Sequence, residues 1–87
     1  MNEITNSSDI VIFLQNYFKQ YGKQIEPTQD LFECGALDSI GVMELVAFIE
    51  ESLCFSFVQD SMQIDNFRSI ESISKTILRS KSTVNNL

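Results

Sequence analysis

The chain has 87 residues, of which 44% are hydrophobic, and a formal net charge of −6 at pH 7. This composition argues against a disordered chain, and the negative charge makes nucleic-acid backbones and anionic membranes poor partners. No apolar run approaches the roughly 20 residues that cross a bilayer. We expect one domain over 1–87, with a core from about 8 to 80 and a polar C-terminal tail over 81–87.

A first helix is predicted by one face of apolar and aromatic residues, with Ser7, Ser8 and Asp9 as cap candidates and Gly22 as its end. The residues of that face are Ile10, Leu14, Tyr17, Phe18 and Tyr21. From Lys23 to Leu37 the chain contains a proline, and its apolar residues follow no regular spacing. This segment is therefore predicted to be a loop of about 15 residues. Leu31 and Phe32 are expected to pack beneath this loop.

A second helix is predicted from Ser39 to Leu53. Steps of 100° per residue place a core stripe on one side: Val42, Leu45, Val46, Ile49 and Leu53. The opposite side mixes apolar residues with acids: Ile40, Met43, Glu44, Ala47 and Glu51, with Phe48 at the margin. Such a face is either covered by the chain's own loop or docks a partner that is apolar and basic. Both interpretations stay open.

The last third of the chain predicts a short helix and a long one. Phe55 and Phe57 are expected to pack against Phe67. The segment from Gln59 to Asn66 is long enough for one or two helical turns. Ser69 then caps a last helix that ends near Ser80, with inward residues Ile70, Ile73, Ile77 and Leu78. The predicted fold is all-α, a four-helix bundle of three long helices and one short one.

The charges and the cysteines limit the possible sites. All six basic residues lie outside the segment from Gln24 to Phe67, which holds nine acids. This one-sign surface is either a solvated face or an attraction for basic partners. Histidine is absent, and Cys34 and Cys54 form no Cys-x-x-Cys motif, so no metal site is expected. We expect a cytoplasmic monomer with reduced thiols.

The start of the second helix offers two possible caps, Asp38 and Ser39. With Asp38 as the N-cap, Leu37 and Val42 form a hydrophobic staple and the carboxylate faces the positive end of the helix dipole. Ser39 is then the first helical residue, and its hydroxyl is free and faces solvent. A serine nucleophile needs a base such as His, and no Gly-x-Ser-x-Gly elbow is present. Ser39 is therefore predicted to be modified by another enzyme, at a helix N-terminus that tolerates a phosphodiester.

The stretch GALDSIGVMELVAFIEE, from Gly35 to Glu51, resembles the modification motif of acyl and peptidyl carrier proteins. That motif reads roughly Gly-x-x-Asp-Ser-Leu and precedes an acidic, apolar helix. The flanking stretches DLFECG and NFRSIESISKTI extend the similarity over roughly Ile10 to Leu78. The resemblance implies a discrete, non-catalytic carrier whose Ser39 receives 4′-phosphopantetheine from coenzyme A through a phosphopantetheinyl transferase. The arm would then hold cargo as a thioester.

The resemblance also implies that basic patches of partner enzymes dock on the second helix. With the exposed residues of the same face included, the expected docking residues are Asp38, Ile40, Met43, Glu44, Ala47, Glu50 and Glu51. The chain departs from the family pattern at Ile40, where Leu is usual, and at Gly41, where many fatty-acid carriers have an acid.

Three hypotheses for function remain open: two follow from the resemblance, and one follows from the acidic face alone. The first is a carrier of acyl intermediates in fatty-acid or polyketide-type biosynthesis. The second is an aminoacyl or peptidyl carrier of a nonribosomal-peptide-type pathway, loaded by an adenylating ligase. The third is an unmodified acidic helical interaction module.

Overall fold

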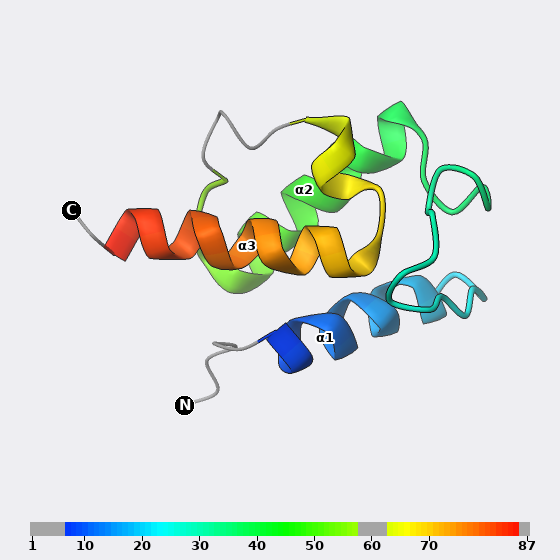
Figure 1. Ribbon diagram of the computed structural model, residues 1–87, viewed down its shortest axis with the longest axis horizontal. Coiled ribbons are helices and arrows are strands. Elements are labelled where there is room, and N and C mark those ends of the chain that lie inside the picture. The colour runs from blue at the N-terminus through cyan, green and yellow to red at the C-terminus, as the bar shows by residue number, and fades with distance from the viewer. Residues whose placement is uncertain (1–6, 58–62, 86–87) are drawn as a thin grey trace.

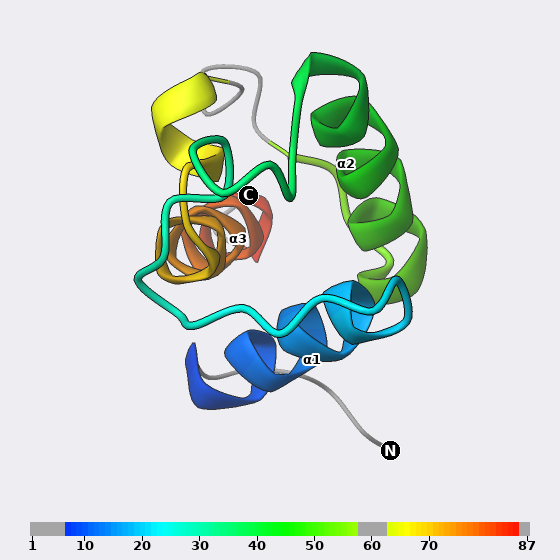
Figure 2. The ribbon, with the colours of Figure 1, turned by 90° about the vertical axis from the view of Figure 1, so that its right-hand side faces the viewer.

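The computed structural model describes residues 7–57 and 63–85, and within these residues it is all-helical without strands. The helices are α1 (Ser7–Lys19), α2 (Ser39–Leu53), the single 3-10 turn η2 (Ile64–Phe67) and α3 (Ile70–Asn85). The three α-helices surround a common centre, and the long connection between α1 and α2 crosses one end of the molecule (Figures 1 and 2). The predicted short helix falls partly on residues 58–62, which lie outside the described residues. Its described remainder, residues 63–66, overlaps η2, which extends one residue further, to Phe67.

The core lies between the three α-helices and is closed by residues of the connections. Its members are at most 8% exposed: Ile10, Leu14, Phe18, Ile25, Leu31, Leu37, Leu45, Val46, Ile49, Phe57, Phe67, Ile70, Ile73 and Ile77. The predicted stripe of α2 is therefore confirmed at its centre, and its end members Val42 and Leu53 are half-buried. Phe57 packs edge-on against Phe67, with ring centroids 5.6 Å apart, as predicted.

The first helix begins and ends earlier than predicted. Ser8 and Asp9, expected as caps, lie inside its first turn because the helix starts at Ser7. The helix stops at Lys19, and the turn that follows places Gly22 at φ +77°, a conformation that glycine adopts without strain. Tyr21 consequently lies beyond the helix and is 64% exposed, so its predicted place on the face of the first helix is wrong.

The last helix starts as predicted and ends later. The Ser69 hydroxyl accepts a hydrogen bond of 3.1 Å from the backbone N–H of Ser72, which is the geometry of an N-cap. The helix continues to Asn85, so the predicted end near Ser80 is wrong. The sequence contains no Gly or Pro after Gly41, and hence no residue that stops a helix strongly. None of the described helices is long and apolar enough to span a bilayer.

Candidate functional site

The connection before α2 is held to the rest of the fold by backbone hydrogen bonds and a buried side chain. Leu31 is fully buried, and its N–H donates to the carbonyl of Arg68 at 2.7 Å. The N–H of Leu37 donates in turn to the carbonyl of Leu31 at 3.0 Å. The prediction that Leu31 anchors this loop is confirmed. Because Leu37 directly precedes Asp38, the anchor also sets the direction in which the chain enters α2.

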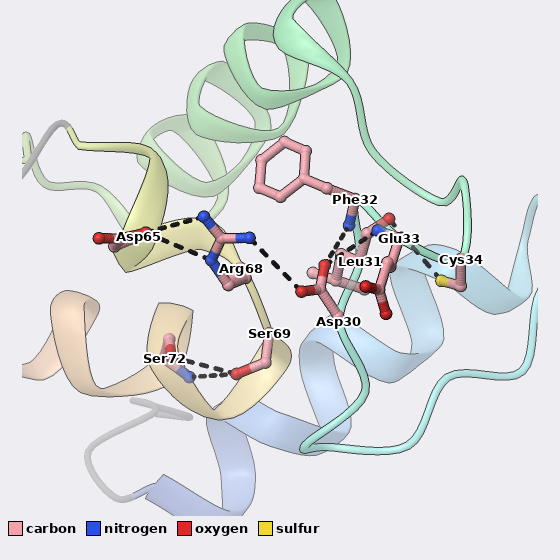
Figure 3. A network of polar contacts seen from close by, with 9 residues as sticks. All are labelled: Asp30, Leu31, Phe32, Glu33, Cys34, Asp65, Arg68, Ser69 and Ser72. Atoms are coloured by element: carbon pink, nitrogen blue, oxygen red, sulfur yellow. Dashed lines mark hydrogen bonds and ion pairs between the residues drawn. The ribbon is translucent and has the colours of Figure 1, made fainter.

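A second set of contacts ties the same loop to η2 (Figure 3). The Asp30 carboxylate accepts hydrogen bonds from the backbone N–H groups of Glu33 (2.9 Å) and Phe32 (3.0 Å). These N–H donors, with Glu33 first, and the Arg68 guanidinium lower the pKa of Asp30. Arg68 reaches Asp30 at 3.5 Å and Asp65 at 2.9 Å, and its guanidinium lies 5.9 Å from the centre of the Phe32 ring.

These ion pairs lie at the surface, since the Arg68 side chain is 49% exposed and that of Asp30 is 30% exposed. Exposed pairs contribute little to global stability. Their effect is local, because Arg68 joins the loop to η2 by two carboxylates that are far apart in the sequence. Nothing in the sequence predicts the pairing of Asp30 with Arg68, although an Asp whose side chain accepts from the N–H groups two and three residues later is a recognisable turn signal.

Asp38 is the N-cap of α2, as predicted. Its backbone is extended, at φ −137° and ψ −173°, and its Oδ1 accepts a hydrogen bond of 2.7 Å from the N–H of Gly41. Its carbonyl accepts from the N–H of Val42 at 2.9 Å, which opens the helical ladder. Leu37 is buried and Val42 is half-buried against the same core, as a hydrophobic staple requires.

Ser39 is the first residue of α2 and is exposed. Within 7–57 and 63–85, no hydrogen bond joins its hydroxyl to another residue. The first turn of α2 carries no acid, and the unpaired N–H groups of a helix N-terminus favour negative charge. The surroundings of the hydroxyl therefore fit a phosphodiester, apart from the carboxylate of Asp38, which is already engaged by an N–H donor.

Because Gly41 has no side chain, it leaves space for the Asp38 carboxylate that caps α2. A Cβ at this position would lie 3.2 Å from Oδ1 of Asp38 and 3.3 Å from Cδ2 of Leu37, closer than most Cβ contacts. A glycine inside a helix costs about 1 kcal/mol relative to alanine. The close approach explains why a small residue is accommodated here in spite of that cost.

The outer face of α2 is open to solvent. Ile40 is 69% exposed and Met43 is 71% exposed, and Glu44, Ala47 and Glu51 are exposed beside them. The described loop does not cover this face, so the first of the two interpretations of it is excluded. Phe48, at the margin, is half-buried.

Glu50 differs from the other expected docking residues. It is half-buried, and its Oε2 accepts a hydrogen bond of 2.9 Å from the N–H of Phe57. This bond stabilises the turn that follows α2. Glu50 is therefore held at the edge of the outer face, whereas Glu44 and Glu51 are exposed.

A row of aromatic rings closes the seam between α1 and α2. Phe13 stacks on Phe48 at 5.5 Å, Tyr17 contacts Phe48 at 4.8 Å, and Tyr17 contacts Tyr21 at 5.3 Å. Burial, followed by the nearby Tyr21 and by the charge of Glu44, raises the pKa of Tyr17. Sequence reasoning did not find this row, because the sequence did not show which faces of the two helices meet.

The row ends at a groove between the end of α1 and the first turns of α2. The groove has a volume of about 190 Å³, and its walls include Tyr17, Phe18, Tyr21, Leu37, Gly41 and Glu44. The two free cysteines, Cys34 and Cys54, are exposed and do not line it. Among the described residues, no group of three or more Cys, Asp or Glu side chains could hold a metal ion.

The comparison with protein families agrees with this site. A family model described as the phosphopantetheine attachment site matches residues 18–77, which include Asp38, Ser39 and the whole of α2. No curated protein and no solved structure gives a significant match. Because the family model covers more than half of the chain, the chain belongs to the phosphopantetheine attachment-site family, whose members carry a covalently attached 4′-phosphopantetheine group.

Proposed function

We propose that the chain is a discrete acyl carrier protein and that Ser39 is its point of attachment for 4′-phosphopantetheine. The observation that carries this proposal is that the exposed Ser39 hydroxyl has no hydrogen-bond partner among the residues that the structure describes. Asp38 satisfies the N–H of Gly41, so Ser39 has no capping duty and its oxygen stands open at the front of α2. We further propose that η2 belongs to the short fourth helix of the expected bundle.

The attached group, the chain and the modifying enzyme would each have a separate role. The attached group supplies a terminal thiol that holds cargo as a thioester. The chain offers the Ser39 oxygen, holds it at a fixed place with the Asp38 cap, and leaves the activation of that oxygen to a phosphopantetheinyl transferase. With no histidine in the sequence, no imidazole can act as a base for Ser39. We therefore propose a non-catalytic carrier that is the substrate of its partner enzymes.

The outer face of α2 is proposed as the docking surface for those partners. Ile40, Met43 and Ala47 offer apolar contact, while Asp38, Glu44 and Glu51 offer charge; Glu50 adds its charge from the edge of the face. An acidic surface speeds encounter with basic patches more than it strengthens binding. A carrier that visits several enzymes needs rapid release, and this kind of surface allows it. The exposed free thiols fit a reducing compartment, for which we propose the cytoplasm.

The proposed cargo is an acyl intermediate of fatty-acid or polyketide-type biosynthesis, delivered by a loading ligase or transferase. A second candidate is an aminoacyl or peptidyl carrier. One observation favours it: the first turn of α2 carries no acid, because Gly41 stands where many fatty-acid carriers have one. The docking end is therefore less acidic than in those carriers, which fits a different set of partners.

Intact mass spectrometry tests the proposal. The protein is incubated with coenzyme A and a broad-specificity phosphopantetheinyl transferase, beside a Ser39→Ala variant. We expect the mass of one arm to be added to the parent protein and none to the variant. If the parent gains no mass, the unmodified interaction module becomes the better account. The mass of the loaded arm recovered from cells separates acyl from aminoacyl cargo.

A further inference from the structure

The groove at the end of α1 lies beside the proposed docking surface, and Glu44 belongs to both. Glu44 is exposed on α2 and also forms part of the groove wall, together with Gly41. Opposite it, Tyr21 contacts the Tyr17 ring on one side and is 64% exposed. In Figure 2 the end of α1 and the start of α2 both face the viewer. A protein that approaches the start of α2 therefore meets this groove.

The groove lies away from the flank on which Ser39 sits. At 3.6 residues per turn, Gly41 is turned by about 200° from Ser39 around the axis of α2, and Glu44 by about 140°. An arm attached to Ser39 would leave from the other side of the helix. The groove is thus placed to receive a side chain of a docked protein and not the chain's own attached group.

The expected size of an interface supports contact with this region. A standard interface buries roughly 800 Å² on each partner and involves about 20–30 residues a side. The exposed residues of α2 are too few to supply that alone, so a docked enzyme must also cover a neighbouring surface. Tyrosine is enriched in the energetically dominant positions of interfaces, and Tyr21 is the exposed aromatic side chain beside the start of α2.

The charges around the groove specify the partner. Glu44 contributes a carboxylate on the α2 side, and Lys23 contributes an ammonium group on the side of the loop. The walls between them are aromatic and aliphatic, with Tyr17, Phe18 and Leu37 among them. A complementary surface therefore carries a large apolar side chain, with a basic residue on one side of it and an acidic residue on the other.

We propose that this groove, with Tyr21 at its rim, receives such an apolar side chain of the enzyme that modifies Ser39, and thereby extends the docking surface from α2 onto the end of α1. The inference rests on the proposed function, since it needs an enzyme that acts on Ser39. Tyr21 touches the partner and not the reacting atoms. Its loss is therefore expected to weaken binding of the carrier without slowing the chemical step.

Steady-state kinetics with the same broad-specificity transferase test the proposal. In Tyr21→Ser we expect KM for the carrier to rise about tenfold with kcat unchanged. Ile12→Ser is the matched control, because Ile12 is an apolar residue of α1 that is 55% exposed and does not line the groove; its KM should equal that of the parent. Lys23→Glu should raise KM as well, since it would place a carboxylate opposite the partner's acidic residue.

Five results would overturn the inference. Parental KM in Tyr21→Ser, or an equal rise in Ile12→Ser, would remove the groove from the interface while leaving the modification of Ser39 intact. A fall in KM for Lys23→Glu would show that the partner surface facing residue 23 is basic and carries no acidic residue there. If the ring signals of Tyr17 and Tyr21 shift when the arm is attached and no enzyme is present, the arm itself occupies the groove. Failure of the parent to be modified at all would overturn this inference and the proposed function together.

Discussion

Replacing Asp38 by alanine tests the local structure on which the site depends. The variant loses the acceptor for the N–H of Gly41, a hydrogen bond of 2.7 Å at the third position of α2. Loss of an N-cap side chain costs about 1 kcal/mol, within a range of roughly 0.5 to 2. For a chain of this size, 1 kcal/mol corresponds to a fall in Tm of about 4–8 °C. We expect Asp38→Ala to unfold within that range below the parent.

Thermal unfolding followed by circular dichroism at neutral pH measures the difference. Asp38→Asn and Asp38→Ser are the controls, because each keeps a side-chain oxygen that can accept from the N–H of Gly41. They should unfold much closer to the parent than Asp38→Ala does. If Asp38→Ala unfolds with the parent, or if Asp38→Asn loses as much stability as Asp38→Ala, the side chain is not the cap. The Asp38 cap would then no longer explain why the Ser39 hydroxyl is not needed for capping.

Three further predictions follow from the contacts around the site. Gly41→Ala should raise the free energy of unfolding by less than the full helix-propensity difference of about 1 kcal/mol, because the new Cβ crowds the Asp38 carboxylate. In an Asp38→Ala background the same change should raise the free energy of unfolding by more. If the two changes are simply additive in denaturant unfolding, the Cβ does not crowd the carboxylate. Leu31→Ala removes a fully buried anchor and should cost about 2–5 kcal/mol in urea unfolding, whereas a loss below 0.5 would mean that the loop is not packed on the core. The lowered pKa of Asp30 means that its carboxylate stabilises the fold above a pH of about 4, and that this contribution is lost as the pH falls through the folded-state pKa. The stability advantage of the parent over Asp30→Asn should therefore shrink as the pH falls below about 4. An advantage that stays constant would show that Asp30 is not held by its N–H donors and Arg68.

The parts of the structure that the sequence predicted are those fixed by local signals. The Asp38 cap and the apolar spacing after it define α2, so both ends of that helix were predicted at Ser39 and Leu53. Ser69 likewise marks the start of α3 through its own hydrogen bond to Ser72. These features depend on residues within one or two turns of each other, and their physical causes can be read directly.

The parts that the sequence did not predict depend on contacts between distant segments. The helical period placed Tyr21 on the face of the first helix, but α1 stops before that residue is reached and Tyr21 is exposed. Arg68 and Asp30 are 38 positions apart, and their pairing appears only when the loop and η2 are brought together. The groove needs the end of α1 beside Gly41 and Glu44, which no local pattern encodes.

Fragmentation of the modified protein determines which serine carries the arm. Ser39, Ser52 and Ser56 are all exposed, so exposure alone does not select among them. Ser39, directly after the cap of α2, is the serine that we expect to carry the arm. After incubation with coenzyme A and transferase, tandem mass spectrometry should assign the added mass to Ser39. Its recovery on Ser52, Ser56 or any other hydroxyl would contradict the account.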